Sequence, residues 1–114
     1  MTNGEYFRRG NTKYDNNDYE GAITDFSKVI EINPRDNKAY SYRGFLKSKN
    51  QDDIGAIADF KKAIEFNPND GKTYAFKGLS KIILGQQENG CIDIKKAKRL
   101  GYKDALVIIN HVCK

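Results

Sequence analysis

The stretch DYEGAITDFSKVIEINP, residues Asp18–Pro34, decides the fold, because it returns as DDIGAIADFKKAIEFNP at Asp52–Pro68. The interval from Asp18 to Asp52 is the period of the pattern. The same period continues outside the two copies, where two residue types recur in step: Tyr6, Tyr40 and Tyr74, with Gly10, Gly44 and Gly78. A fixed period of this length is typical of stacked repeats. The sequence therefore predicts a repeat architecture built from one unit used several times.

Each copy has the pattern of an amphipathic helix with defined ends. From Tyr19 to Ile30 the apolar side chains recur every three or four residues, the spacing of one helix face. An aspartate precedes each helix and is suited to accept hydrogen bonds from its first free amides, Asp18 in one copy and Asp52 or Asp53 in the other. Proline disfavours helical geometry in the residue before it, so each helix should end at its Asn-Pro pair, Asn33-Pro34 and Asn67-Pro68.

A second helix should precede each of these. The ranges Asn3–Asp15 and Asn37–Lys49 are about a dozen residues long, and Asp36 and Asp70 are placed to cap the helices that follow them. Short turns force the two helices of a unit to run antiparallel. Small residues pair at one level of each unit, Gly10 with Ala22, Gly44 with Ala56 and Gly78 with Gly90. Glycine inside a helix costs about 1 kcal/mol relative to alanine, so these pairs indicate close helix approach.

The pattern Tyr-x-x-x-Gly, then Ala-x-x-x-Phe, then Pro, at this period, resembles the tetratricopeptide repeat (TPR). The resemblance implies an all-α fold, a right-handed α-α superhelix of seven antiparallel helices. It implies a single domain over residues 1–114, with repeats at 3–36, 37–70 and 71–104 and a capping helix at 102–113. The third repeat departs from the pattern: Ile94 replaces the phenylalanine, Lys98 stands where Ile30 and Ile64 stood, and no proline ends the helix. Such departures suit a last repeat.

The resemblance also implies a function and a surface. In TPR arrays the first helix of each repeat lines a concave groove that takes up a partner segment. The corresponding positions are Phe7, Arg8, Asn11, Tyr14 and Asp15, then Lys38, Ser41, Tyr42, Phe45 and Lys49, then Lys72, Phe76, Leu79 and Ile83. Aromatic anchors among lysines suit an amphipathic, acidic protein or peptide partner. Alternatively, the capping helix covers Leu79 and Ile83.

One TPR specialisation can be compared residue by residue. Co-chaperones hold the C-terminal carboxylate of heat-shock chaperones with a clamp of lysine, asparagine, asparagine, lysine and arginine. The corresponding residues here are Phe7, Asn11, Tyr42, Lys72 and Phe76. Only Asn11 and Lys72 agree, so a carboxylate would lose most of its charge-assisted hydrogen bonds. The sequence therefore predicts a peptide-binding adaptor that is not a carboxylate clamp.

The two cysteines leave two interpretations open. Cys91 lies ten residues before Gly101, and Cys113 lies twelve after it. A helical hairpin about Gly101 would bring them to nearly the same level. They then form either a disulfide that holds the last helix or a pair of small buried hydrophobes. With His111 they supply three metal ligands, fewer than structural zinc requires.

The sequence offers little for catalysis. No phosphate-binding loop or nucleophile motif occurs, and the acidic residues are interpreted as helix caps and polar faces. A protein that is not an enzyme, with no metal and no cofactor, is the expectation. Residues 71–114 carry 9 Lys and Arg against 3 Asp and Glu, notably Lys95, Lys96, Lys98, Arg99 and Lys103. Because no aromatic residue interleaves this cluster, a solvated terminal helix is favoured over a nucleic-acid surface.

The sequence also gives expectations for location and assembly. No apolar run is long enough to cross a bilayer, and the first residues lack signal-peptide character. A cytoplasmic protein is expected, or a periplasmic or exported one if a leader has been trimmed. Tyr6 and Phe7 begin the array with nothing upstream to cover them. Self-association through the terminal helices is therefore the alternative function, with a monomer or weak homo-oligomer expected.

Overall fold

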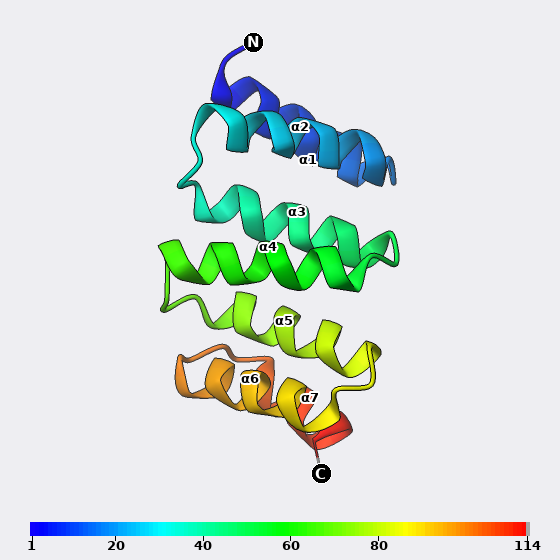
Figure 1. Ribbon diagram of the computed structural model, residues 1–114, viewed down its shortest axis with the longest axis vertical. Coiled ribbons are helices and arrows are strands. Elements are labelled where there is room, and N and C mark those ends of the chain that lie inside the picture. The colour runs from blue at the N-terminus through cyan, green and yellow to red at the C-terminus, as the bar shows by residue number, and fades with distance from the viewer. Residues whose placement is uncertain (114) are drawn as a thin grey trace.

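The computed structural model of the protein describes residues 1–113, which form seven α-helices and no strand. Consecutive helices run antiparallel and stack along one axis, with the two termini at opposite ends (Figure 1). The stack measures 46 × 25 × 21 Å. The all-α class is therefore confirmed. The helices are α1 (Asn3–Asp15), α2 (Tyr19–Ile32), α3 (Asn37–Lys49), α4 (Asp53–Phe66), α5 (Gly71–Ile83), α6 (Gln87–Arg99) and α7 (Ala105–Val112).

The helix ends follow the expected chemistry. An aspartate caps each of α2 to α5 by accepting a hydrogen bond from the amide three residues later, and these caps are Asp18, Asp36, Asp52 and Asp70. Of the two candidates before α4, Asp52 is the cap, whereas Asp53 accepts a hydrogen bond from Ser48 Oγ at 2.8 Å. α2 and α4 end just before the Asn-Pro pairs, as predicted.

The last helix begins later than the sequence indicates. The expected start was Tyr102, but α7 begins at Ala105. Gly101 has φ +89°, and the Tyr102 amide turns back to donate to the Ala97 carbonyl at 3.0 Å, which closes the end of α6. Residues 102–104 therefore belong to the turn. One face of α7, including Ile108 and Ile109, packs against the end of the stack.

The helices of each repeat approach closely at the glycine positions. A Cβ built on Gly44 would lie 2.8 Å from Phe60 Cε1 and 3.1 Å from the Ala56 carbonyl oxygen. A Cβ on Gly78 would lie 2.5 Å from the Gly90 carbonyl oxygen. Neither position has room for a side chain, so the close approach inferred from the sequence is confirmed.

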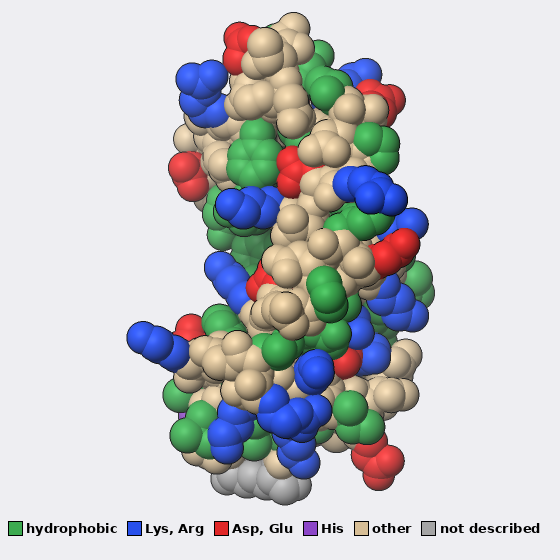
Figure 2. Space-filling view, turned by 90° about the vertical axis from the view of Figure 1, so that its left-hand side faces the viewer, with side chains coloured by type: hydrophobic (Ala, Val, Ile, Leu, Met, Phe, Trp, Pro, Cys, Tyr) green, Lys and Arg blue, Asp and Glu red, His purple; other side chains and the backbone are tan. Residues whose placement is uncertain are grey.

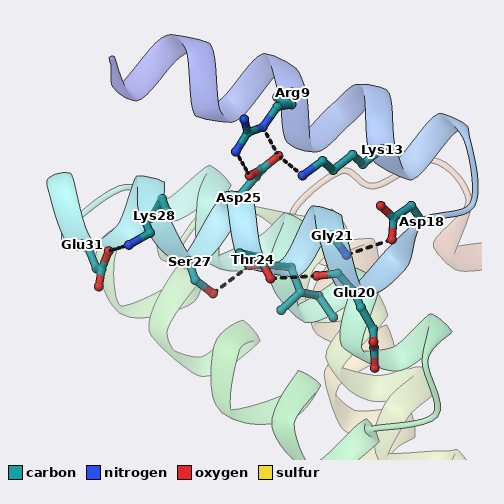
Figure 3. A network of polar contacts seen from close by, with 11 residues as sticks. Arg9, Lys13, Asp18, Glu20, Gly21, Thr24, Asp25, Ser27, Lys28 and Glu31 are labelled. Atoms are coloured by element: carbon teal, nitrogen blue, oxygen red, sulfur yellow. Dashed lines mark hydrogen bonds and ion pairs between the residues drawn. The ribbon is translucent and has the colours of Figure 1, made fainter. Parts of the chain in front are cut away.

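A buried aspartate joins the two helices of every repeat at the same period. In the first repeat, Asp25 points from α2 toward α1 and accepts hydrogen bonds from Arg9 Nε at 2.9 Å and Nη2 at 2.8 Å, with Lys13 Nζ at 3.2 Å (Figure 3). The later repeats carry the same arrangement at the equivalent positions: Asp59 with Arg43 and Lys47, and Asp93 with Lys77 and Lys81.

The interpretation of the acidic residues as caps and polar faces was wrong for these three. Asp25, Asp59 and Asp93 are 0%, 4% and 7% exposed. A buried carboxylate without partners would be costly, so each requires the cations that face it. Arg43 also donates to Ser27 Oγ of the preceding repeat at 3.1 Å, which connects one repeat to the next.

The pairing shifts the affinity of these groups for protons. Hydrogen bonds from Arg9, and secondarily from Lys13, hold the pKa of Asp25 below its usual 3.8 despite the opposing effect of burial. The hydrogen bond to Asp59 raises the pKa of Arg43. In the third repeat, burial dominates and lowers the pKa of Lys77, although Asp93 opposes this. The first two pairings are thus favoured as fully charged pairs.

We expect Gly78→Ala to lower the free energy of unfolding by about 2 kcal/mol, because the added methyl group meets a helix backbone that cannot move aside. Gly4→Ala in α1 is the control, since a Cβ there has no neighbour within 4 Å. It should leave stability unchanged or raise it by less than about 1 kcal/mol. Urea denaturation of both variants measures the difference. Equal stability of the two would contradict the close helix contact.

We expect Asp25→Asn to cost roughly 2 kcal/mol at pH 7, because it removes a buried charge that two cations share. The pKa of Asp25 is lower in the folded than in the unfolded protein. Its contribution to the free energy of unfolding is therefore complete above about pH 4 and is lost as the pH falls through the folded pKa. The stability difference between wild type and variant should therefore vanish in strong acid. Urea denaturation across this range measures it.

Glu31→Gln is the matched control for that measurement, since it is the same kind of change in the same helix. Glu31 pairs with Lys28 at 3.3 Å, but both side chains are exposed. Its effect should stay below about 0.5 kcal/mol. A comparable loss in both variants would show that burial of Asp25 contributes nothing.

Candidate functional site: the groove of the first helices

A hollow of about 350 Å³ opens on the face made by α1, α3 and α5. In Figure 2 the side of the stack is hollowed at mid-height, with apolar side chains inside and Lys or Arg beside it. Of the residues expected to face a partner, eight line this hollow: Asn11, Tyr14, Lys38, Ser41, Tyr42, Phe45, Lys72 and Phe76. The rings of the first helices therefore leave a concave surface open.

Aromatic rings form one wall of the hollow across all three repeats. Phe45 lies at its centre, with its ring centroid 5.8 Å from that of Tyr14 and 5.1 Å from that of Phe76. Tyr42 lies 5.5 Å from Phe26, a buried ring of α2. These distances fit favourable aromatic pairing. Because each ring is held by a neighbour, the wall is ordered before any partner arrives.

Polar side chains of the lining join two repeats. Thr73 Oγ1 donates to Asp70 Oδ2 at 2.7 Å, which commits the single hydroxyl hydrogen of Thr73. Ser41 Oγ, 2.6 Å from Thr73 Oγ1, therefore donates to it. The chain Ser41–Thr73–Asp70 fixes α3 against the start of α5 and satisfies the buried Thr73 hydroxyl.

Lysines border the hollow and give its lining a net positive charge. Lys38 and Lys72 occupy the same position of successive repeats, and both line its edge. The Lys72 ammonium lies 5.6 Å from the centre of the Phe76 ring, and the Lys49 ammonium lies 5.4 Å from the centre of the Phe45 ring. Asp70 is the one acidic residue in the lining. The site thus presents aromatic surface with movable cations at its edge.

Some predicted groove residues lie elsewhere. Phe7 does not line the hollow, but its ring packs 5.1 Å from that of Phe26 and 5.3 Å from that of Tyr42, which both line it. Arg8 and Asp15 are exposed and line neither hollow. A smaller hollow of about 210 Å³ adjoins the first and includes Lys49, Leu79 and Ile83 in its lining.

Leu79 and Ile83, the two residues expected near the capping helix, differ in how far they are buried. Leu79 packs against the core cluster that residues of α7 also join, and it lines the smaller hollow as well. Ile83 is 66% exposed, which shows that α7 leaves it uncovered.

Four lining residues were missed by the sequence analysis: Phe26, Leu46, Asp70 and Thr73. Phe26 and Leu46 lie in the core cluster beneath the groove, and their outer atoms form its base. Asp70 was recognised only as a helix cap. Its side chain does cap α5, and the same carboxylate also faces the hollow. The sequence did contain a signal for this role, because Asp70 directly precedes a helix that was expected to line the groove.

The cysteines lie at the C-terminal end of the stack. Cys91 near the start of α6 and Cys113 just after α7 are joined by a disulfide, with their Cα atoms 5.6 Å apart. The Gln87 side chain also donates to the Val112 carbonyl and joins the same two helices. His111 is exposed, with Nδ1 2.8 Å from the Val107 carbonyl oxygen. Among residues 1–113, no three His, Cys, Asp or Glu side chains gather as metal ligands would.

Comparison with known proteins agrees with this geometry. A family model described as TPR repeat matches residues 10–51. The first TPR domain of Spaghetti (RPAP3), solved bound to the HSP90 peptide SRMEEVD, superposes with a TM-score of 0.92 at 18% identity, covering 97% of this chain and 90% of that one. The chain has the TPR fold, and its residues 10–51 also match the TPR family model. Its helices correspond to three TPR units and a capping helix, and the right-handed superhelix is confirmed.

Two further structures show the same fold. The Arabidopsis OM64 TPR domain gives a TM-score of 0.91 at 20% identity and covers 96% of this chain and 93% of that one. The TPR2B domain of yeast Sti1, solved as a complex with pHsp70, gives 0.84 at 27% identity and covers 92% and 82%. No curated protein sequence matches the chain significantly. None of the helices described combines the length and apolar character needed to cross a bilayer.

We expect the disulfide to stabilise the TPR fold by about 3 kcal/mol, because it closes a loop between residues 22 apart. Cys91→Ser/Cys113→Ser should unfold at lower urea concentration than the oxidised wild type, and a reductant should bring the wild type to the level of the variant. The variant itself should not respond to reductant. Two free thiols in native protein purified without reductant would contradict the bond.

Proposed function

We propose that this protein is a non-catalytic adaptor that holds a segment of a partner protein in the groove of its first helices. The observation that carries the proposal is the hollow between α1, α3 and α5, whose aromatic wall is already ordered. Rigid aromatic surface binds with little loss of side-chain entropy. The mechanism is burial of partner side chains against Tyr42, Phe45 and Phe76, with no chemical step.

The positive charge around the hollow indicates which kind of partner segment the groove suits. Lys38 and Lys72 stand at the edge of the hollow, and Lys49 extends the positive charge toward the smaller one. Cations at the rim speed association with acidic segments and select against basic ones. The groove therefore suits an amphipathic segment that has one or two large apolar side chains beside Asp or Glu.

The similar structures support peptide binding, and this chain differs from a carboxylate clamp within the same fold. The Spaghetti and Sti1 structures are described with peptides of HSP90 and HSP70. Here Phe7 and Phe76 stand at two cationic clamp positions, and both rings are packed against other rings. Neither offers a charged donor. Recognition should therefore depend on internal side chains of the segment and not on its C-terminal carboxylate.

Location and assembly follow from the same contacts. A disulfide persists in oxidising compartments, so the bond between Cys91 and Cys113 favours the periplasmic or exported alternative over a cytoplasmic location. Self-association was motivated by exposed Tyr6 and Phe7, but both side chains are half-buried. We therefore propose that the protein works as a monomer.

Selection from a random-peptide display library, followed by affinity measurement on the selected peptides, tests the adaptor proposal. The peptides should be enriched in Asp or Glu next to aromatic or large aliphatic residues. Tyr42→Ala/Phe45→Ala should weaken their binding by at least about 30-fold, because central aromatic anchors carry most of the energy of such contacts. Amidating the peptide C-terminus should change affinity less than about twofold.

Tyr6→Ala/Phe66→Ala is the matched control. It also removes two half-buried rings from the first two repeats, but neither ring lines the groove. Binding by this variant should stay within about threefold of wild type, and both variants should keep the helical circular dichroism spectrum. Failure to select any peptide, or equal losses in the two variants, would refute the groove as the binding site.

A further inference from the structure

The end of the stack formed by α6 and α7 concentrates unpaired positive charge. Five cations lie close together in the sequence: Lys95, Lys96, Lys98, Arg99 and Lys103. The other described lysines of the last third are engaged elsewhere, because Lys77 and Lys81 pair with Asp93 and Lys72 lies at the groove. No ion pair joins any of the five to another residue of the described part of the chain.

The chain provides its own comparison for this charge. In the first two repeats the lysine equivalent to Lys96 is neutralised by a glutamate three residues later, Lys28 by Glu31 at 3.3 Å and Lys62 by Glu65 at 3.4 Å. The third repeat has Arg99 at the position of those glutamates. Lys98 also replaces an isoleucine of the earlier repeats. The fold tolerates an acid and an apolar residue at these two positions, so packing does not require the cations.

Exposed aliphatic side chains follow these cations closely in the chain. Leu106 and Val107, in the first turn of α7, are 48% and 58% exposed. The turn at Gly101 connects the last turn of α6, which carries Lys98 and Arg99, to the first turn of α7, which carries both aliphatic side chains. We call the five cations with Leu106 and Val107 the basic end. Figure 2 shows Lys and Arg side chains gathered over the C-terminal end of the stack, beside apolar ones.

We propose that the basic end docks the protein on a membrane surface rich in anionic phospholipid. Clustered Lys and Arg are attracted to anionic headgroups, and aliphatic side chains among them can enter the boundary between headgroups and acyl chains. A surface for single-stranded nucleic acid typically carries exposed aromatic rings for base stacking as well. The one ring nearby, Tyr102, is half-buried, and its hydroxyl lies 3.4 Å from Asp104.

Flotation with phospholipid vesicles tests the proposal. Wild type should bind vesicles of equal parts phosphatidylcholine and phosphatidylglycerol at low ionic strength, bind them less at high ionic strength, and leave pure phosphatidylcholine vesicles unbound. Arg99→Glu/Lys103→Asn introduces the residues that the second repeat has at these positions, Glu65 and Asn69. It lowers the charge by three, and binding should weaken by roughly 100-fold, about fivefold for each charge.

Two further variants isolate the contributions of position and apolar contact. Arg35→Glu/Lys61→Asn removes the same charge from exposed residues outside the basic end and should bind within about threefold of wild type. Leu106→Ser/Val107→Ser should weaken binding about tenfold with the same salt dependence. All three variants should keep the wild-type circular dichroism spectrum.

Several results would overturn the proposal. No binding to the anionic vesicles at low ionic strength would do so, as would an equal loss in Arg35→Glu/Lys61→Asn, which would make the effect one of net charge alone. Unchanged binding by Leu106→Ser/Val107→Ser would rule out insertion of these side chains. Tighter binding to a single-stranded oligonucleotide than to the vesicles, lost in Arg99→Glu/Lys103→Asn, would assign the basic end to nucleic acid.

Discussion

The structure depends on how closely the two helices of each repeat approach. Gly44 and Gly78 leave no room for a side chain at the point of contact, so the paired helices meet almost backbone to backbone there. Beside that contact, a buried aspartate from the second helix is held by two cations from the first. The glycine sets the distance, and the ion pair selects which faces meet, because an aspartate turned any other way would be buried without a partner. The buried ion pair recurs in all three repeats.

The groove is a consequence of that constraint. One face of each first helix packs against the second helix of its repeat. The residues on the opposite face of α1, α3 and α5 are left for the concave side of the stack. There the repeat period brings similar rings together, as in the contact between Phe45 and Phe76. The rings order one another, and the Ser41–Thr73–Asp70 chain fixes the spacing of the helices beneath them. The surface proposed to bind a partner thus consists of residues that also hold neighbouring repeats in register.

Much of this could be predicted because it depends on local chemistry. The helix ends follow from Asp18, Asp36 and the Asn-Pro pairs, which act through their own backbone neighbours. The buried aspartates were missed, although Asp25, Asp59 and Asp93 recur at the same period, because an aspartate on a helix usually faces water. Their burial depends on two cations from the preceding helix, which the spacing within one helix does not reveal. The start of α7 was placed too early because the turn of Tyr102 onto Ala97 is a contact that apolar periodicity does not show.

The third repeat lacks some of the ion-pair and capping contacts of the first two, and other contacts hold the end of the array. Lys77 stands at the position of the arginine of the earlier repeats, and Lys81 stands at the position of their lysine. Asp93 therefore receives one contact from each lysine and lacks the bidentate contact that an arginine makes. Gln86 provides no side-chain cap for α6. The short α7 covers the apolar end, and a covalent bond from Cys91 to Cys113 holds it there. That bond lies at the far end of the hairpin from Gly101, whereas near Gly101 the buried side chains of Ala97 and Ala105 pack in one core cluster. The basic end consists of half-buried and exposed side chains on either side of Gly101, so the surface proposed to meet a membrane lies at the other end of the α6–α7 hairpin from the disulfide.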